Sequence, residues 1–99
     1  MKINLGLDNT WLYQNCRIEE VAGRKNLVTP VKDAINTMGR NITDRFVYAN
    51  PREEREEVTL TGPMAVWAYM VVFHAVVHRF KRVYYDDGKG VPVLIAAHG

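Results

Sequence analysis

An uncharged, strongly apolar segment at residues 64–77 constrains the fold of this chain more than any other feature. Its length of about 14 residues is short of the roughly 20 that a membrane-spanning helix needs. Gly62 and Pro63 precede it, and proline suits the first turn of a helix because its missing N–H would have no partner there. Although valine is frequent in the segment, its length favours a helix over a strand. We therefore predict a buried helix, capped by Thr59 or Thr61.

Two neighbouring stripes of this predicted helix are apolar apart from its histidines. One stripe contains Met64, Trp67, Val71, His74 and His78, and the other contains Val66, Met70, Phe73 and Val77. Such a helix packs under a sheet on one side and against a second chain or the remaining core on the other. The pattern therefore predicts a homo-oligomer.

Composition bounds the class of protein. The chain has 99 residues, of which 47% are hydrophobic and 24% charged, so we predict one globular domain at residues 1–99. A formal net charge of +2 gives no strong field for DNA or a membrane. A single cysteine, Cys16, excludes an intramolecular disulfide and suggests a reducing cytoplasm. The alternating start of the chain predicts no signal peptide.

Alternation and turn residues predict the remaining elements. In the first half we expect a strand at 2–7, an antiparallel return at 11–18, a loop at 19–26 and a helix from Thr29 and Pro30 to Gly39. Residues 41–50 suit a strand fragment or a packed loop, and the charged residues 51–57 suit a surface loop. In the second half we expect strands at 58–60, 83–85 and 91–97.

The resulting order, β-β-α-β-α-β-β, predicts a small α/β domain with a mixed sheet of about five strands and two helices. The strand–helix–strand unit at 58–85 predicts a parallel crossover. Both helices lie on one face of the sheet or are split across its two faces. The strand at 91–97 is very apolar, which predicts a central position.

Candidate functional residues follow these strands. Asp86, beside Asp87, ends a predicted parallel strand, where open α/β sheets bind ligands. His98 ends the antiparallel neighbour, so it and Asp86 are expected to be apart within one chain and to meet only in a dimer. His74 and His78 have the spacing of metalloprotease histidines, but Ala75 replaces the required glutamate.

Structural readings compete with these functional ones. His74 suits a core histidine whose nitrogens are satisfied by backbone or water. His98 suits an ordinary tail residue.

The order and spacing of features in residues 62–98 resemble the CRISPR-associated Csx-three family of ring nucleases, which act on cyclic oligoadenylates in antiviral defence. The matching features are Gly62 and Pro63, Trp67, His74, the strand end at Val83, Tyr84, Tyr85 and Asp86, then Gly88 or Gly90, and finally His98. After this strand the family has Asp-Pro-Arg-Leu-Gly. Here Lys89 stands nearest to its arginine, as a point charge without a bidentate fork.

The resemblance implies a homodimer or homotetramer that holds cyclic tetra-adenylate and cleaves it with Mn²⁺ or another divalent metal. Under that hypothesis His74, Asp86 and His98 are the metal-binding and acid–base residues. The phosphate contacts are then Arg79, Lys81, Arg82 and Lys89. Two alternatives remain: a protein that binds the cyclic RNA without cutting it, and a plain oligomerisation module.

Overall fold

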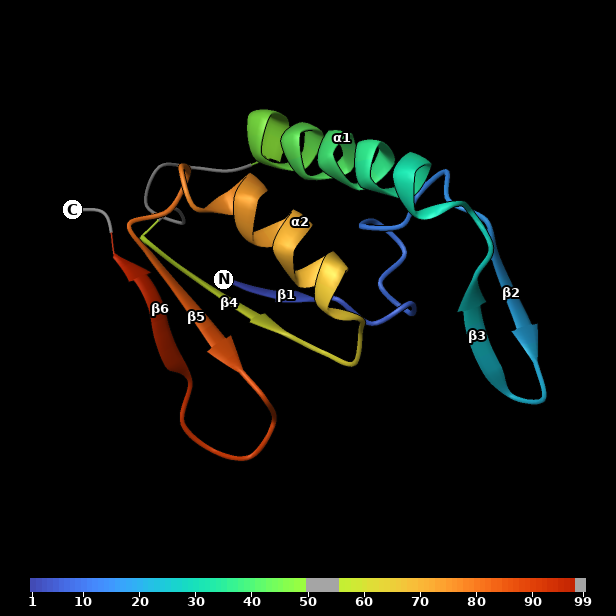
Figure 1. The fold of residues 1–99 in the computed structure, drawn as a ribbon. Coiled ribbons are helices and arrows are strands. Elements are labelled where there is room, and N and C mark those ends of the chain that lie inside the picture. The colour runs from blue at the N-terminus through green and yellow to red at the C-terminus, as the bar shows by residue number, and fades with distance from the viewer. Residues whose placement is uncertain (50–55, 98–99) are drawn as a thin grey trace.

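In the computed structural model the described residues are 1–49 and 56–97, with the backbone alone for residues 47–49 (Figure 1). The elements along the chain are β1 (Lys2–Asn4), β2 (Ile18–Val21), β3 (Arg24–Leu27), α1 (Val31–Ala49), β4 (Glu57–Thr61), α2 (Val66–Val76), β5 (Arg82–Asp86) and β6 (Val93–Ala97).

The main sheet has four strands in the order β1-β4-β5-β6, and β2 and β3 form a separate hairpin. Strands β1, β4 and β5 are parallel, and β6 is antiparallel to β5. A register shift between Val83 and Tyr84 leaves Ile95 as an extra residue in β6. The predicted class is confirmed: a small α/β domain with two helices and a mixed sheet.

Both helices lie on the same face of the main sheet (Figure 1). The parallel strands follow one another across the sheet in chain order, so both crossovers advance in the same direction. Because crossovers of one hand that advance in one direction place their helices on one face, the described part of the chain has no helix on the opposite face. Of the two predicted arrangements, the structure has the one-sided form.

The core lies between this sheet face and the two helices. On α2 the buried residues are Ala68, Val72 and Val76, which follow a line of their own rather than either predicted stripe. On α1 the buried residues are Ala34, Met38, Ile42 and Phe46, and the rings of Phe46 and Phe80 meet edge to face at 5.2 Å between centroids. The predicted stripes are therefore only partly covered: four of their residues are half-buried against the core, one is buried and four are exposed (Met64, Trp67, Val71 and Phe73; Val77; Val66, Met70, His74 and His78).

For residues 11–26 the predicted positions of the strand and the loop were wrong. Residues 11–16 form turns, and the strands β2 and β3 occupy the predicted loop. The turn between them contains Ala22 and Gly23, both at positive φ, as a two-residue hairpin turn requires. Leu12 is buried, and the side-chain amide of Asn41 donates to the carbonyl oxygens of Leu12 and Gln14, so tertiary contacts fix the turn segment.

The first helix is longer than predicted. It continues through Gly39 to Ala49, because Met38, Ile42 and Phe46 keep the helical spacing of buried residues. The hydroxyl of Thr29 accepts a hydrogen bond from the N–H of Arg17. Residues 50–55, which include most of the predicted charged loop, lie outside the described residues.

Two predictions for the second half were also wrong. The N-cap of α2 is Ala65, with no side-chain capping bond, so neither Thr59 nor Thr61 caps the helix. Strand β6 is at the edge of the sheet rather than at its centre, and its apolar side chains are about half exposed.

Within residues 1–49 and 56–97, no helix combines the length and hydropathy that crossing a membrane requires.

Candidate functional site

The unit β4–α2–β5 places Asp86 at the carboxyl end of a parallel strand, as predicted. The hydroxyl of Thr61, at the end of β4, donates a 2.9 Å hydrogen bond to the carbonyl oxygen of Asp86. In the turn that follows, the Oδ1 atoms of Asp86 and Asp87 accept 2.8 Å hydrogen bonds from the N–H groups of Gly88 and Lys89. Asp86 is half-buried and Asp87 is exposed. Because β5 ends at Asp86, the two carboxylates lie together at the carboxyl edge of the sheet.

His74, on α2, and His78, two residues after the helix ends at Val76, are both exposed, and their ring centroids lie 6.5 Å apart. The alternative that His74 is a core histidine is therefore wrong. It was reasonable from sequence because apolar residues flank His74 on both sides, and periodicity alone did not separate the buried line of α2 from its neighbours.

His74 and Asp86 are at opposite ends of the β4–α2–β5 unit. Helix α2 starts near the carboxyl end of β4 and returns toward the start of β5. His74 is eight residues after Val66, roughly 12 Å further along the helix axis. Asp86 is at the far end of β5. Within one chain the structure does not bring these two side chains together.

The third predicted catalytic residue, His98, lies outside the described residues. Ala97, the last described residue, pairs with Arg82 at the start of β5, at the opposite end from Asp86. Across residues 1–49 and 56–97, no three His, Cys, Asp or Glu side chains group closely enough to hold a metal ion. The described part of one protomer therefore does not form the predicted metal site.

The four predicted phosphate contacts divide between the two ends. At the start of β5, Lys81 forms a 3.0 Å ion pair with Glu56, and Arg82 forms one of 3.0 Å with Glu57. The hydrogen bond to Glu57 is the main reason that the pKa of Arg82 is raised. Arg79 donates from Nε to the carbonyl oxygen of Ala75, three residues before His78.

Lys89 is at the other end, exposed in the turn after Asp86 and Asp87. It is the cation nearest in sequence to the two carboxylates. The other three cations lie at the opposite end of the β4–α2–β5 unit, where α2 ends and β5 begins. His74 is on the side of that end as well.

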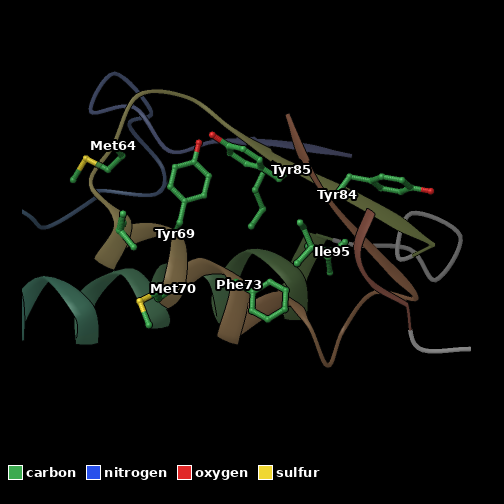
Figure 2. A pocket seen from close by; sticks show the side chains of 10 residues that line it. Met64, Tyr69, Met70, Phe73, Tyr84, Tyr85 and Ile95 are labelled. Atoms are coloured by element: carbon green, nitrogen blue, oxygen red, sulfur yellow. The ribbon is translucent and has the colours of Figure 1, made fainter. Parts of the chain in front are cut away.

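Sequence reasoning missed an apolar groove between α2 and the strands β5 and β6 (Figure 2). Its volume is about 410 Å³, within the range of small-molecule sites. It is lined by Leu60, Met64, Val66, Tyr69, Met70, Phe73, Val83, Tyr84, Tyr85 and Ile95. The available signal was the second apolar stripe of residues 64–77, which contains Val66, Met70 and Phe73.

Tyr69 anchors the groove at the end nearest Asp86. Its hydroxyl donates a 2.5 Å hydrogen bond to the carbonyl oxygen of Gly62, and its ring meets that of Tyr85 edge to face at 5.4 Å. Burial raises the pKa of Tyr69, and the neighbouring Tyr85 and Asp86 raise it further. Aromatic side chains of this kind can stack nucleobases.

Gly62 is the residue that this arrangement requires. Its φ is +105°, and an added Cβ would lie 2.1 Å from Oδ1 of Asn4. A side chain there would displace the close contact between the ends of β4 and β1, and with it the carbonyl that accepts from Tyr69.

No protein-family model matches the chain, and comparisons with curated proteins and with solved structures find no significant match. The resemblance of residues 62–98 to the Csx-three family stays a prediction. The features that bear on function are the groove, the carboxylates at its end and the exposed His74 and His78.

Proposed function

We propose that the protein is a cytoplasmic, CRISPR-associated ring nuclease, which binds cyclic tetra-adenylate and cleaves its phosphodiester bonds. The observation that carries the proposal is the exposure of His74 on an otherwise apolar helix. Imidazole is the side chain that most often transfers protons near neutral pH. Because His74 is not a buried core residue, it is accessible to a ligand.

The groove supports a nucleotide ligand. It presents the aromatic rings of Tyr69, Phe73 and Tyr85, which suit an adenine base, and Tyr69 is close enough to Asp86 for that carboxylate to raise its pKa. A base held there has its sugar and phosphate near the turn that contains Asp86, Asp87 and Lys89. Aromatic and acidic groups at one end of a groove therefore favour a nucleotide over a purely apolar ligand.

The proposal requires more than one protomer. His74 and Asp86 of one chain are at opposite ends of the β4–α2–β5 unit, so a site that uses both combines His74 of one copy with Asp86 of another. A cyclic ligand with repeated units suits such a symmetric assembly, because identical contacts recur around it. A homodimer or homotetramer therefore remains part of the proposal.

Manganese dependence also remains part of the proposal, since imidazole and carboxylate ligands accept divalent transition metals. The described residues of one chain do not form a three-ligand site, so we derive no step of cleavage through the metal. Such an ion, where bound, would neutralise phosphate charge and activate water. The cations Arg79, Lys81, Arg82 and Lys89 would hold the phosphates.

Incubation of the protein with labelled cyclic tetra-adenylate, with and without Mn²⁺, tests the proposal. Linear products that require the protein support it. A stable complex with intact ligand would show a binding protein instead, and the absence of both binding and cleavage would leave an oligomerisation module. An Asp44→Asn variant, which changes an exposed carboxylate on α1, is the matched control for changes at Asp86.

A further inference from the structure

Strand β6 is an apolar edge strand whose irregularity at Ile95 is a modest protection of the sheet edge. It contains no charged residue and no proline between Val93 and Ala97, and within residues 1–49 and 56–97 only β5 pairs with it. The opposite edge, β1, is three residues long and begins with Lys2. Unprotected apolar edges are rare in monomers because they pair with other strands.

The surface beside this edge is also apolar and exposed. On β6, Val93, Leu94 and Ile95 are 57%, 49% and 53% exposed, and on α2 Val66 and Met70 are 74% and 66% exposed. The groove joins the two sets, and none of its lining residues is charged. Contiguous exposed apolar surface of this kind marks an interaction site.

The ends of the β5–β6 hairpin carry opposite charge. At the turn end, Asp86 and Asp87 outnumber Lys89. At the other end, among the described residues, three cations outnumber two carboxylates: Arg79, Lys81 and Arg82 against Glu56 and Glu57. A partner strand that runs antiparallel to β6 and repeats this pattern would place each acidic end beside a basic one.

We infer that the partner of this surface is a second copy of the chain, paired antiparallel along β6 about a two-fold axis. The pairing joins two four-stranded sheets into one of eight strands. It also places both copies of α2 on the same face, so that the two grooves form one cleft. The extra residue at Ile95 shortens the backbone ladder, so apolar side chains of β6 and α2 provide much of the contact.

The inferred interface rests on the edge strand, the exposed apolar surface and the charges of the β5–β6 hairpin, and it does not rest on the proposed function. It does have a consequence for that function. Antiparallel pairing puts the Asp86 end of one copy at the same end of the joined sheet as the His74 end of the other. The two β5 strands are three strand spacings apart, roughly 14 Å, which suits a ligand of several nucleotides rather than a single ion.

Cysteine crosslinking tests the pairing directly. Ile95 is the middle residue of β6, so it faces its own copy near the two-fold axis. Opposed residues of antiparallel strands have Cα atoms about 4.5–5.5 Å apart, which a disulfide can span. In a Cys16→Ser background, Ile95→Cys should give a covalent dimer on mild oxidation. Val21→Cys, equally exposed on β2, should not.

An Ile95→Cys variant that stays monomeric on oxidation, or a Val21→Cys variant that crosslinks as well, would overturn the inference. Light scattering provides a second readout. The wild type should have a mass of at least 22.8 kDa, twice the 11.4 kDa of one chain. Ile95→Lys should halve the wild-type mass with an unchanged circular dichroism spectrum, whereas Val21→Lys should keep it. A monomeric wild type, or an Ile95→Lys variant of wild-type mass, would contradict the inference.

Discussion

The hydroxyl of Thr61 donates a hydrogen bond to the backbone carbonyl oxygen of Asp86, its register partner on the adjacent strand. The bond joins the carboxyl ends of β4 and β5 through a side chain, in addition to the ladder between the strands. It holds the backbone from which the Asp86 carboxylate projects. Thr61 is therefore a positioning residue for that carboxylate.

Under the proposed function, replacing Thr61 by valine should lower kcat for cyclic tetra-adenylate several-fold with little change in KM. The change keeps the side-chain shape and removes one hydrogen bond, which costs about 1 kcal/mol. Thr59→Val is the matched control, because Thr59 is half-buried two residues earlier on the same strand. Equal kinetic effects of the two variants would show that Thr61 has no specific role.

The sequence predicted the β4–α2–β5 unit because its signals are local. A long uncharged segment between two short apolar runs has few alternatives to a helix between parallel strands. The same reasoning failed for β6, because apolar composition was taken to mean burial in the sheet. Edge strands that pair with another chain look the same in sequence as central strands.

The candidate site could be predicted only where its signals are local in the sequence. Asp86 follows a strand, so its place at the carboxyl edge could be predicted. The exposure of His74 could not, because it depends on which line of α2 faces the sheet, and both neighbouring lines are apolar. The groove depends on α2 leaving β6 uncovered, which is a tertiary relationship without a local signal.

If the protein is a ring nuclease as proposed, His74→Ala should reduce turnover of cyclic tetra-adenylate by a factor of about 10² to 10⁴, as expected for loss of a general acid–base group. Because His74 is exposed, the free energy of unfolding should change by no more than about 0.5 kcal/mol. Rapid-quench kinetics and urea unfolding measure the two effects. Asn36→Ala, at an exposed polar position on α1, is the control. A fully active His74→Ala variant would exclude the catalytic role.

Stability should fall as the pH rises above about 10. Burial raises the pKa of Tyr13 above the ordinary value of about 10, and Cys16 and Tyr69 add to the increase. The unfolded chain then loses the tyrosine proton first, so the stabilisation is complete below pH 10 and is lost above it. Urea unfolding between pH 8 and 11 measures this slope.

Tyr13→Phe should flatten that slope. It should also lower stability at neutral pH by about 1–3 kcal/mol, because the hydroxyl of Tyr13 donates to the buried carbonyl oxygen of Leu5. A variant that keeps the wild-type pH dependence would show that Tyr13 is not its source.

Deletion of residues 98 and 99 should leave the fold intact, because the last buried core residue in the described part of the chain is Val83. If His98 acts as an acid–base group, turnover should fall about ten-fold or more. Thermal unfolding and the cleavage assay give the two readouts. Full activity in the shortened chain would leave the chemistry to His74 and Asp86.

In the proposed ring nuclease, the active site combines His74 of one protomer with Asp86 of another. The most direct test mixes two inactive variants, His74→Ala and Asp86→Asn, and refolds them together. In a random mixture of symmetric dimers, half of the dimers contain one of each variant, and each of these has one intact composite site. Cleavage should therefore recover to about a quarter of the wild-type rate. A mixture that stays as inactive as its components would contradict the account.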